Sequence, residues 1–422
     1  MHKRKTITVF EHESIRLNQK FDGDIVFDQN NLNGFQRFYG NGLPYFDLIH
    51  NGIRFNQFVG VIQVGETVVE VLPKADKNSI SNEVETKWRE VLIQMLQFVH
   101  GFEIHAPSSS SLKIKQNSIL DLYFELFIKE VEYLLHKGLV KKYRKKIGNQ
   151  KALKGSLQFS QHINHNLIHK ERFYVQHTTY DTRHVINIIL HQTLLVLQTL
   201  NTSPRLSSRI NKLLLNFPEM PIKRITESTF NKIVLNRKTS DYKRAIDIAR
   251  LILLRYHPNL SNGRANVLAL MFDMNSLWEQ FVLKCLKEQQ DFCVKGQQSK
   301  NLWKPEYGNK RTLRPDILIL TKGKNYILDT KWKLVDNKPS IEDIRQMYSY
   351  LHYFKAEKTA LLYPGSQSYF SGNFMDVEKN YLPSKLECGL LFTEVTQEGS
   401  LNQWKNKIIN DVKKWLETDT SN

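Results

Sequence analysis

The chain has 422 residues, which is long for one core and predicts two or three domains. Hydrophobic residues make up 41% and charged residues 24% of it, so a globular protein with a sizeable core is expected. Lys and Arg outnumber Asp and Glu by 60 to 42, a formal net charge of +18. Such an excess indicates a polyanionic partner, most simply nucleic acid; charge that only aids solubility is the alternative.

Several classes of protein are excluded by motifs that the sequence lacks. The three cysteines, Cys285, Cys293 and Cys388, form no CxxC pair and no even framework, so neither a structural zinc nor a disulfide scaffold is expected. The basic start of the chain leads into Glu11 rather than a continuous apolar segment, and no run of about 18 apolar residues occurs. We therefore expect a cytoplasmic protein without a signal peptide or a membrane span. No GxxxxGK[ST] motif occurs, so no nucleotide is expected to bind to this chain itself.

Residues 1–82 are predicted to form a β-rich domain, either a small barrel or a sandwich. Short apolar runs there are interrupted by turn signals such as Asn51-Gly52. The segments 58–64 and 68–74 are rich in β-branched residues and flank a turn at Gly65, so they are expected to pair as a hairpin.

Residues 83–262 are predicted to be mainly helical and basic, with Gly138 ending one of the helices. Residues 263–422 combine helical and strand-like segments and predict an α/β domain. The fold class is thus multidomain α+β. The helices expected from apolar periodicity cover residues 84–99, 119–137, 180–200, 241–256, 273–290, 341–355 and 404–416. The strands expected in the last domain cover residues 312–320, 325–331 and 358–363.

A PD…DxK pattern lies in this last domain. Pro315 and Asp316 are followed, thirteen residues after Asp316, by Asp329, and Lys331 stands two positions further on. Phosphodiester hydrolysis needs carboxylates that hold a divalent metal and a cation that positions water or stabilises the pentavalent phosphorus. The pattern supplies both kinds of group.

The strands around this pattern explain how its side chains could converge. In a hairpin, Asp316 at the start of one strand lies opposite the end of the next, where Asp329 and Lys331 share a face. The Thr330 carbonyl is then expected to be a further metal ligand. A solvated row of charges is the alternative, but both strands are strongly apolar, and charges at the ends of buried strands are costly unless they act together.

Two nearby helices carry further candidate residues. Glu279, flanked by Trp278 and Phe281, either faces the metal site as a catalytic group or is a surface residue in an i,i+4 pair. Gln346 and Tyr350 share a helix face and either contact the phosphate or the lysine, or belong to a helix that is only packed.

A basic segment lies in the middle of the chain. Residues 137–172 contain ten Lys or Arg against one acid, Glu171. This composition suits contact with DNA phosphates and equally suits docking to an acidic protein surface. His162, His165 and His169 lie in the same segment and are expected to be surface histidines, because a strongly basic neighbourhood repels a metal cation. The candidate contact residues are Lys141, Lys142, Arg144, Lys145 and Lys146.

Over nearly its whole length the sequence resembles McrC, the nuclease subunit of McrBC modification-dependent restriction systems, which act in phage defence. The similarity depends on a series of motifs in order, far more specific than the PD…DTK site alone. They are Val59-Gly60-Val61-Ile62-Gln63-Val64 to Leu72-Pro73-Lys74, Ile93-Gln94-Met95-Leu96, His136-Lys137-Gly138-Leu139-Val140-Lys141-Lys142-Tyr143, Leu153-Lys154-Gly155-Ser156-Leu157, Asp181 to Asn187, and Asp273-Met274-Asn275-Ser276-Leu277-Trp278-Glu279.

The resemblance implies a C-terminal PD-(D/E)xK nuclease domain that uses Mg²⁺, with Mn²⁺ as a substitute. Asp316, Asp329 and Lys331 match the family's catalytic positions. It also implies a partner, a hexameric AAA+ GTPase called McrB, which recognises 5-methylcytosine in double-stranded DNA and whose hydrolysis this chain would stimulate. Lys154 stands where the family usually has Arg, so it receives no role.

Two other functions stay open at this point. The chain could be a self-sufficient repair or recombination nuclease of the same fold, or a non-enzymatic activator whose nuclease fold is structural. The intact set of Asp316, Asp329 and Lys331 argues against the activator. One active site per chain suggests that two nuclease domains act together on the two DNA strands.

Overall fold

The computed structural model describes residues 5–22, 25–39, 44–65, 67–73, 82–100, 119–257, 266–333, 335, 338–376, 378, 380–394 and 401–418. These residues form a mixed α/β protein that divides into two compact units. One unit consists mainly of described residues between 119 and 270, and the other joins N-terminal and C-terminal residues. The predicted division into three consecutive domains, with boundaries at residues 82 and 262, stays a prediction. No described helix combines the length and the apolar character needed to cross a membrane.

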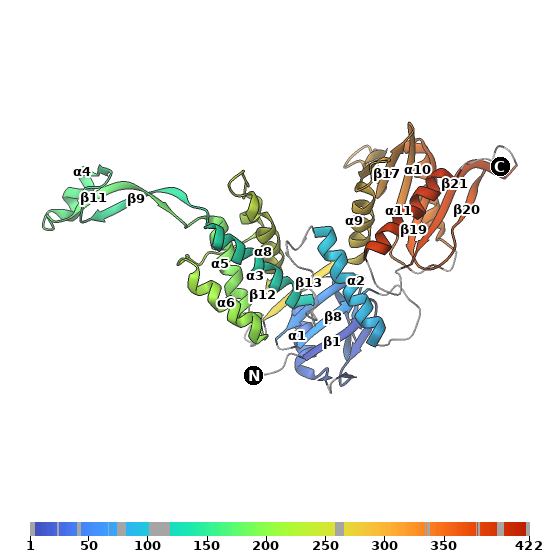
Figure 1. The fold of residues 1–422 in the computed structure, drawn as a ribbon. Coiled ribbons are helices and arrows are strands. Elements are labelled where there is room, and N and C mark those ends of the chain that lie inside the picture. Colours follow the sequence, from blue (N-terminus) through green and yellow to red (C-terminus); the bar gives the residue numbers. More distant parts are fainter. Residues whose placement is uncertain are drawn as a thin grey trace. The chain divides into compact units, whose positions relative to one another are not determined.

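The first unit is a group of packed helices that carries a long β arm (Figure 1). Helix α5 lies at its centre, because apolar side chains on most of its surface are buried. At the base of the arm, the buried Asn187 amide donates to the carbonyl oxygens of Val140 at 2.8 Å and Thr182 at 2.7 Å. The helices are α3 (Ile119–Lys137), α4 (Phe159–Asn166), α5 (Val185–Leu200), α6 (Pro204–Asn216), α7 (Glu227–Asn231), the 3-10 helix η1 (Ser240–Tyr242) and α8 (Lys243–Arg255).

The middle of the chain is mainly helical, as predicted, but the strands of the arm were not predicted. Strands β9 (Lys142–Gln150) and β11 (Phe173–Asp181) pair antiparallel along their full length, and β10 (Ser156–Leu157) pairs with β11. Residues 180–181 therefore end a strand, and the helix predicted over 180–200 begins at Val185. Almost every residue of β9 faces solvent, so its apolar and polar residues do not alternate and no strand pattern appears in the sequence.

The N-terminal part of the second unit is β-rich, as predicted, and the hairpin of β7 (Phe58–Val64) and β8 (Thr67–Leu72) is confirmed. Its strands lie in more than one sheet: β1, β8 and β7 are neighbours in that order within a five-stranded sheet, and the other sheets have the orders β2-β6-β5 and β3-β4. Helix α1 (Gln29–Tyr39) was not predicted, because asparagine is common in its sequence and favours turns. Its buried apolar side chains are Leu32, Phe35 and Phe38. The other elements are β1 (Lys5–Phe10), β2 (Ser14–Arg16), β3 (Lys20–Phe21), β4 (Ile25–Val26), β5 (Phe46–Ile49), β6 (Gly52–Phe55) and α2 (Asn82–His100).

The C-terminal part of the second unit is a six-stranded sheet with helices on both faces (Figure 1). The strand order is β14-β17-β18-β19-β21-β20, and β18, β19 and β21 run parallel. On one face, Met347 and Tyr350 of α10 pack against Ile327. On the other, Trp415 of α11 contacts Tyr326, and Trp278 of α9 donates to the Leu362 carbonyl. The alternation of Tyr326 and Ile327 thus divides β18 between two cores.

Most elements of this part agree with the sequence, and one prediction is wrong. The run 312–320 is not one strand, because Arg314, Pro315 and Asp316 separate β16 from β17; proline lacks a donor for the sheet. Strands β14, β15, β20 and β21 were not predicted. The elements are β14 (Cys293–Gly296), β15 (Lys300–Trp303), β16 (Arg311–Leu313), β17 (Ile317–Thr321), β18 (Lys324–Thr330), β19 (Ala356–Pro364), β20 (Phe370–Asp376), β21 (Leu382–Thr393), α9 (Met274–Lys287), α10 (Ile341–Phe354) and α11 (Leu401–Glu417), with β12 (Tyr256–His257) paired to β13 (Val267–Asp273) before them.

Candidate active site

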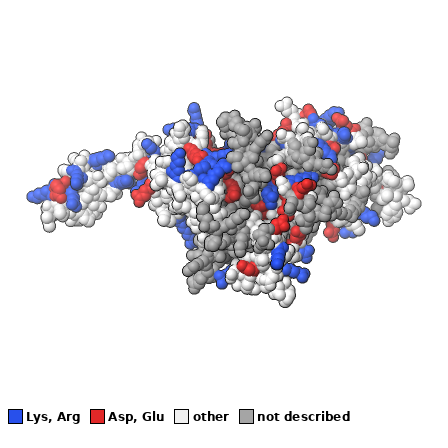
Figure 2. Space-filling view, turned by 60° about the horizontal axis from the view of Figure 1, so that its bottom comes forward, with Lys and Arg blue, Asp and Glu red and all other residues white. Residues whose placement is uncertain are grey.

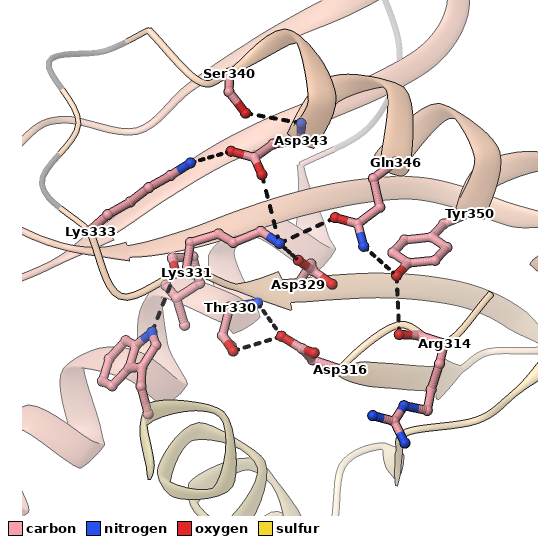
Figure 3. A network of polar contacts seen from close by, with 12 residues as sticks. Arg314, Asp316, Asp329, Thr330, Lys331, Lys333, Ser340, Asp343, Gln346 and Tyr350 are labelled. Atoms are coloured by element: carbon pink, nitrogen blue, oxygen red, sulfur yellow. Dashed lines mark hydrogen bonds and ion pairs between the residues drawn. The ribbon is translucent and has the colours of Figure 1, made fainter. Parts of the chain in front are cut away.

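A tight turn between β17 and β18 brings the two halves of the PD…DxK pattern together. Lys322 and Gly323 at this turn have φ angles of 49° and 74°, the left-handed values of a two-residue hairpin turn. The resulting register pairs Ile317 with Leu328. Asp316, one residue before Ile317, therefore lies beside Asp329, as predicted, at the edge of the sheet where β18 ends (Figure 3).

The Asp316 carboxylate is held by the neighbouring strand. Its Oδ2 atom accepts hydrogen bonds from the backbone N–H and the hydroxyl of Thr330, both at 2.8 Å. Thr330 is itself buried, so this arrangement fixes the orientation of Asp316. The structure thus gives the Thr330 side chain an orienting contact that the sequence did not predict, while its carbonyl as a metal ligand stays a prediction.

Asp329 and Lys331 form a buried ion pair in this site. The Lys331 Nζ atom lies 2.8 Å from Oδ2 of Asp329, a side chain that is 2% exposed. Burial and then the nearby Asp316 carboxylate raise the pKa of Asp329 to about 6, against the opposing effect of Lys331. Burial works against the charge of Lys331, but the carboxylates of Asp329, Asp343 and Asp316 outweigh it and raise the Lys331 pKa. The lysine is therefore held as a cation.

Gln346 and Tyr350 of α10 extend this network, as Figure 3 shows. The Gln346 Oε1 atom accepts from Lys331 at 3.2 Å, and its amide nitrogen donates to the Tyr350 hydroxyl at 2.8 Å. That hydroxyl donates to the Arg314 carbonyl at 3.1 Å. Of the alternatives left open by the sequence, the structure contains the contact of Gln346 with the lysine; contact of either residue with a phosphate stays a prediction.

Asp343 is a member of the site that the sequence reasoning missed. Its carboxylate lies 3.7 Å from Lys331 Nζ and accepts from Lys333 Nζ at 2.5 Å. Burial opposes ionisation of Asp343, but hydrogen bonds from Lys333 and Ser340 lower its pKa below the ordinary value. A signal was present: Ser340 three residues before Asp343 is an N-cap pattern, and Asp343 shares a helix face with Gln346.

Glu279 lies on the Asp316 side of the site. It is half-buried on α9, and its Oε1 atom accepts from the Gln297 amide at 2.7 Å. The Gln297 backbone N–H donates to the Asp316 carbonyl at 2.9 Å, which ties the two segments together. Burial and then the Asp316 carboxylate raise the pKa of Glu279. Glu279 is thus no isolated surface residue, although its catalytic role stays a prediction.

The groups gathered here are hard oxygen donors, which suit Mg²⁺. Asp316 and Asp329 could hold such an ion, because the register of β17 and β18 places the two residues side by side. Within the described part of the chain, no three Asp, Glu, His or Cys side chains converge tightly enough to form a ready metal cluster. A bound Mg²⁺ would therefore need backbone oxygen or water as additional ligands.

The basic residues predicted to contact DNA or a partner lie in the first unit. Lys142, Arg144, Lys145 and Lys146 are on β9, and Lys141 directly precedes it. Asp181 on β11 pairs with Arg144 at 2.9 Å and lies 4.0 Å from Lys146.

The histidines beside them are explained by local structure. His162 on α4 accepts from the Tyr174 backbone N–H at 3.2 Å and stacks on Phe173, and His165 stacks on Tyr174. His162 is half-buried, whereas His165 and His169 are exposed. The prediction of surface positions is therefore confirmed for the last two and wrong for His162, which attaches α4 to β11.

Comparison with known proteins decides the family. A family model described as McrBC 5-methylcytosine restriction system component matches residues 53–364, well over half of the chain. The chain belongs to this McrBC family. The resemblance predicted from the sequence is thereby confirmed. No curated protein matches the chain in sequence.

Solved structures agree with this family in fold. A chain of the refined half-complex from a tetradecameric assembly of Thermococcus gammatolerans McrB AAA+ hexamers with bound McrC matches with a TM-score of 0.73 at 18% identity; 97% of this chain and 100% of that chain are covered. The cryo-EM structure of the Thermococcus gammatolerans McrBC complex matches with a TM-score of 0.50 at 19% identity, covering 67% of this chain and 87% of that chain. At such identities the likeness establishes the fold.

Proposed function

We propose that this chain is the Mg²⁺-dependent endonuclease subunit of an McrBC-type restriction system. The observation that carries the proposal is the convergence of Asp316, Asp329 and Lys331 at one edge of the sheet. Burying the Asp329 carboxylate beside the partly buried Asp316 and Lys331 costs stability, so a purely structural role does not account for them. The order of α9, β17, β18, α10 and β19 around them also suits a PD-(D/E)xK nuclease domain.

The side chains divide the catalytic work. Asp316 and Asp329 would hold Mg²⁺ with the Thr330 carbonyl, and Glu279 would add negative charge beside them. The bound ion would polarise the scissile phosphate and lower the pKa of a water molecule. Lys331, kept cationic by its carboxylate neighbours, would orient that water or stabilise charge that develops on the phosphate. Gln346, which accepts from Lys331 and donates to Tyr350, would keep the lysine in position. Either Gln346 or Tyr350 would also contact the phosphate.

We further propose that the chain works with an McrB-like AAA+ GTPase hexamer in the cytoplasm. The archaeal assembly similar in fold contains McrB hexamers with bound McrC. The β9–β11 arm is a suitable docking element, because exposed apolar side chains gather on it and Lys and Arg lie along it (Figure 2). The chain itself lacks a P-loop, so translocation and recognition of modified cytosine would belong to the partner. The exposed apolar residues of the β9–β11 arm include Leu153, Phe159, Ile163, Leu167 and Ile168.

The proposal is tested by measuring cleavage of methylated and unmethylated double-stranded DNA in the presence of Mg²⁺, GTP and an McrB-like motor protein. Asp329→Asn is expected to abolish cleavage and to leave both partner binding and stimulation of GTP hydrolysis intact. Glu342→Gln is the matched control, since Glu342 is an exposed acid of the same helix that carries Asp343. Full cleavage by Asp329→Asn would contradict the assignment of this active site.

A self-sufficient nuclease is the second candidate, because the catalytic set is complete within this chain. Efficient and specific cleavage without the motor would favour it. We expect poor cleavage by the isolated chain, since no motif in it hydrolyses a nucleotide. Whether two nuclease domains act together is tested by mixing wild-type and Asp329→Asn chains and counting nicked against doubly cut DNA.

A further inference from the structure

A small hairpin directly precedes the catalytic Asp316. Strands β15 and β16 form a two-stranded antiparallel sheet of their own, with an irregularity between Asn301 and Trp303. After β16, only three residues intervene before the buried strand β17, and the last of them is Asp316. The hairpin is therefore connected to the same edge of the sheet as the candidate active site.

The hairpin is strongly basic. Between residues 300 and 314 the sequence has five basic residues and one acid, Glu306. Lys304, Lys310 and Arg311 are exposed, and none of them has an ion-pair partner among the described residues. Cations that no neighbouring carboxylate neutralises are available to a polyanion. The five basic residues are Lys300, Lys304, Lys310, Arg311 and Arg314.

Aromatic side chains accompany these cations. Tyr307 is 86% exposed and Trp303 is 59% exposed. Gly308 next to Tyr307 has a φ of 104°, so the loop turns at a conformation that suits glycine. Large aromatic surfaces left in water beside unpaired cations are typical of nucleic-acid contact, where rings pack on bases and sugars while cations bind phosphates.

The base of the hairpin is fixed to α10. Lys300 Nζ donates to the Tyr353 carbonyl at 2.8 Å and lies 4.9 Å from the centre of the Phe354 ring. Tyr350, whose hydroxyl bonds the Arg314 carbonyl at 3.1 Å, belongs to the same helix and to the active-site network. The hairpin is thus held by the helix that also positions Lys331, so less ordering accompanies binding.

We infer that the β15–β16 hairpin binds the DNA duplex beside the scissile phosphate. Lys304, Lys310 and Arg311 bind backbone phosphates on one side of the cut, and Tyr307 lies in a groove against sugars and base edges. This inference rests on the proposed function and identifies the hairpin as the part of the nuclease domain that binds DNA. Net positive charge and connection to the catalytic carboxylate favour DNA over a protein surface as the occupant.

Binding and cleavage are measured separately to test it. The full chain with Asp329→Asn is titrated into a short fluorescent duplex at several salt concentrations, alone and with the motor partner. Joint Lys304→Ala, Lys310→Ala and Arg311→Ala changes are expected to make the slope of log affinity against log salt shallower by about 2 to 3, since each phosphate contact contributes about 0.9. Tyr307→Ser is expected to weaken binding by about fivefold or more without changing the slope.

Matched controls come from the opposite edge of the sheet. Lys322 lies in the β17–β18 turn and Tyr381 directly precedes β21, both at the ends of strands away from Asp316. Lys322→Ala and Tyr381→Ser are expected to bind DNA as the parent chain does. Equal losses in these controls would show that general charge or surface change, and not the hairpin, determines affinity.

The remaining outcomes are also decisive. Hairpin variants that bind DNA normally, alone and in the complex, overturn the inference. Variants that lose the motor but keep DNA affinity overturn it too, because the hairpin would then be a partner site. The proposed function fails on a different result, the absence of cleavage by the wild-type complex, which leaves the affinity measurements interpretable.

Discussion

The buried Asp329 carboxylate makes a quantitative prediction about stability. Its pKa in the folded chain is about 6, compared with 3.8 for an ordinary Asp, because burial and the Asp316 carboxylate disfavour its charge. A rise of that size corresponds to at most about 3 kcal/mol of unfolding free energy that ionisation removes at neutral pH. Asp329→Asn has no such charge, so we expect this variant to be more stable than the wild type by about 1 to 3 kcal/mol above pH 7.

The sign of the pH dependence follows from the raised pKa. Well below pH 3.8, Asp329 is protonated in both the folded and the unfolded state, and Asp329→Asn is expected to have little stability advantage. The advantage grows between pH 3.8 and about 6 and stays constant at higher pH. All six tryptophans lie in the second unit, so urea unfolding followed by tryptophan fluorescence reports the part that contains the site. A stability difference that is the same at pH 4 and pH 7.5, or a less stable variant at pH 7.5, would refute the reasoning.

Three further predictions concern Trp332, Asp343 and the divalent metal. Trp332→Phe removes the indole N–H that donates to Glu11 at 2.7 Å and is expected to lower the unfolding free energy by about 2 kcal/mol, whereas the exposed Trp303→Phe should leave it unchanged in the same urea experiment. Asp343→Asn is expected to reduce kcat about tenfold with little change in KM, as measured by nicking rates. Asp343→Glu is expected to recover part of the lost kcat. A change in KM as large as the change in kcat would contradict a positioning role for Asp343. Removal of divalent metal with EDTA is expected to stop cleavage while the chain still binds its motor partner in a pull-down.

The hairpin of the candidate active site could be predicted from the sequence because its geometry is local. A two-residue turn sets the register, and the alternation of a strand then places Asp329 and Lys331 on one face. The apolar residues on both strands indicate burial, which makes the charges at their ends informative. Apolar periodicity also predicted the helix of α10, whereas the contact between Gln346 and Lys331 was only one of the alternatives that the sequence left open.

Other features depend on information that a local pattern does not contain. Asp343 reaches the site because of the path of the chain between β18 and α10 and because Lys333 folds back onto it. The β9–β11 arm has no buried face along most of its length, so it carries no periodicity that would predict strands. Pairing of β21 with β19 likewise joins segments that lie far apart in the sequence.

Trp332, the residue after Lys331, shows why the two ends of the chain form one unit. The Trp332 ring contacts Trp88 of α2 and Trp278 of α9, and its indole nitrogen bonds the buried Glu11. A tryptophan buries about 200 Å² of surface, which corresponds to about 5 kcal/mol of apolar burial. A chain that began after α2 would expose this surface next to Lys331 and would leave Trp332 without its carboxylate. The N-terminal β-rich part therefore supports the candidate active site directly, in addition to any contact it makes with a motor protein.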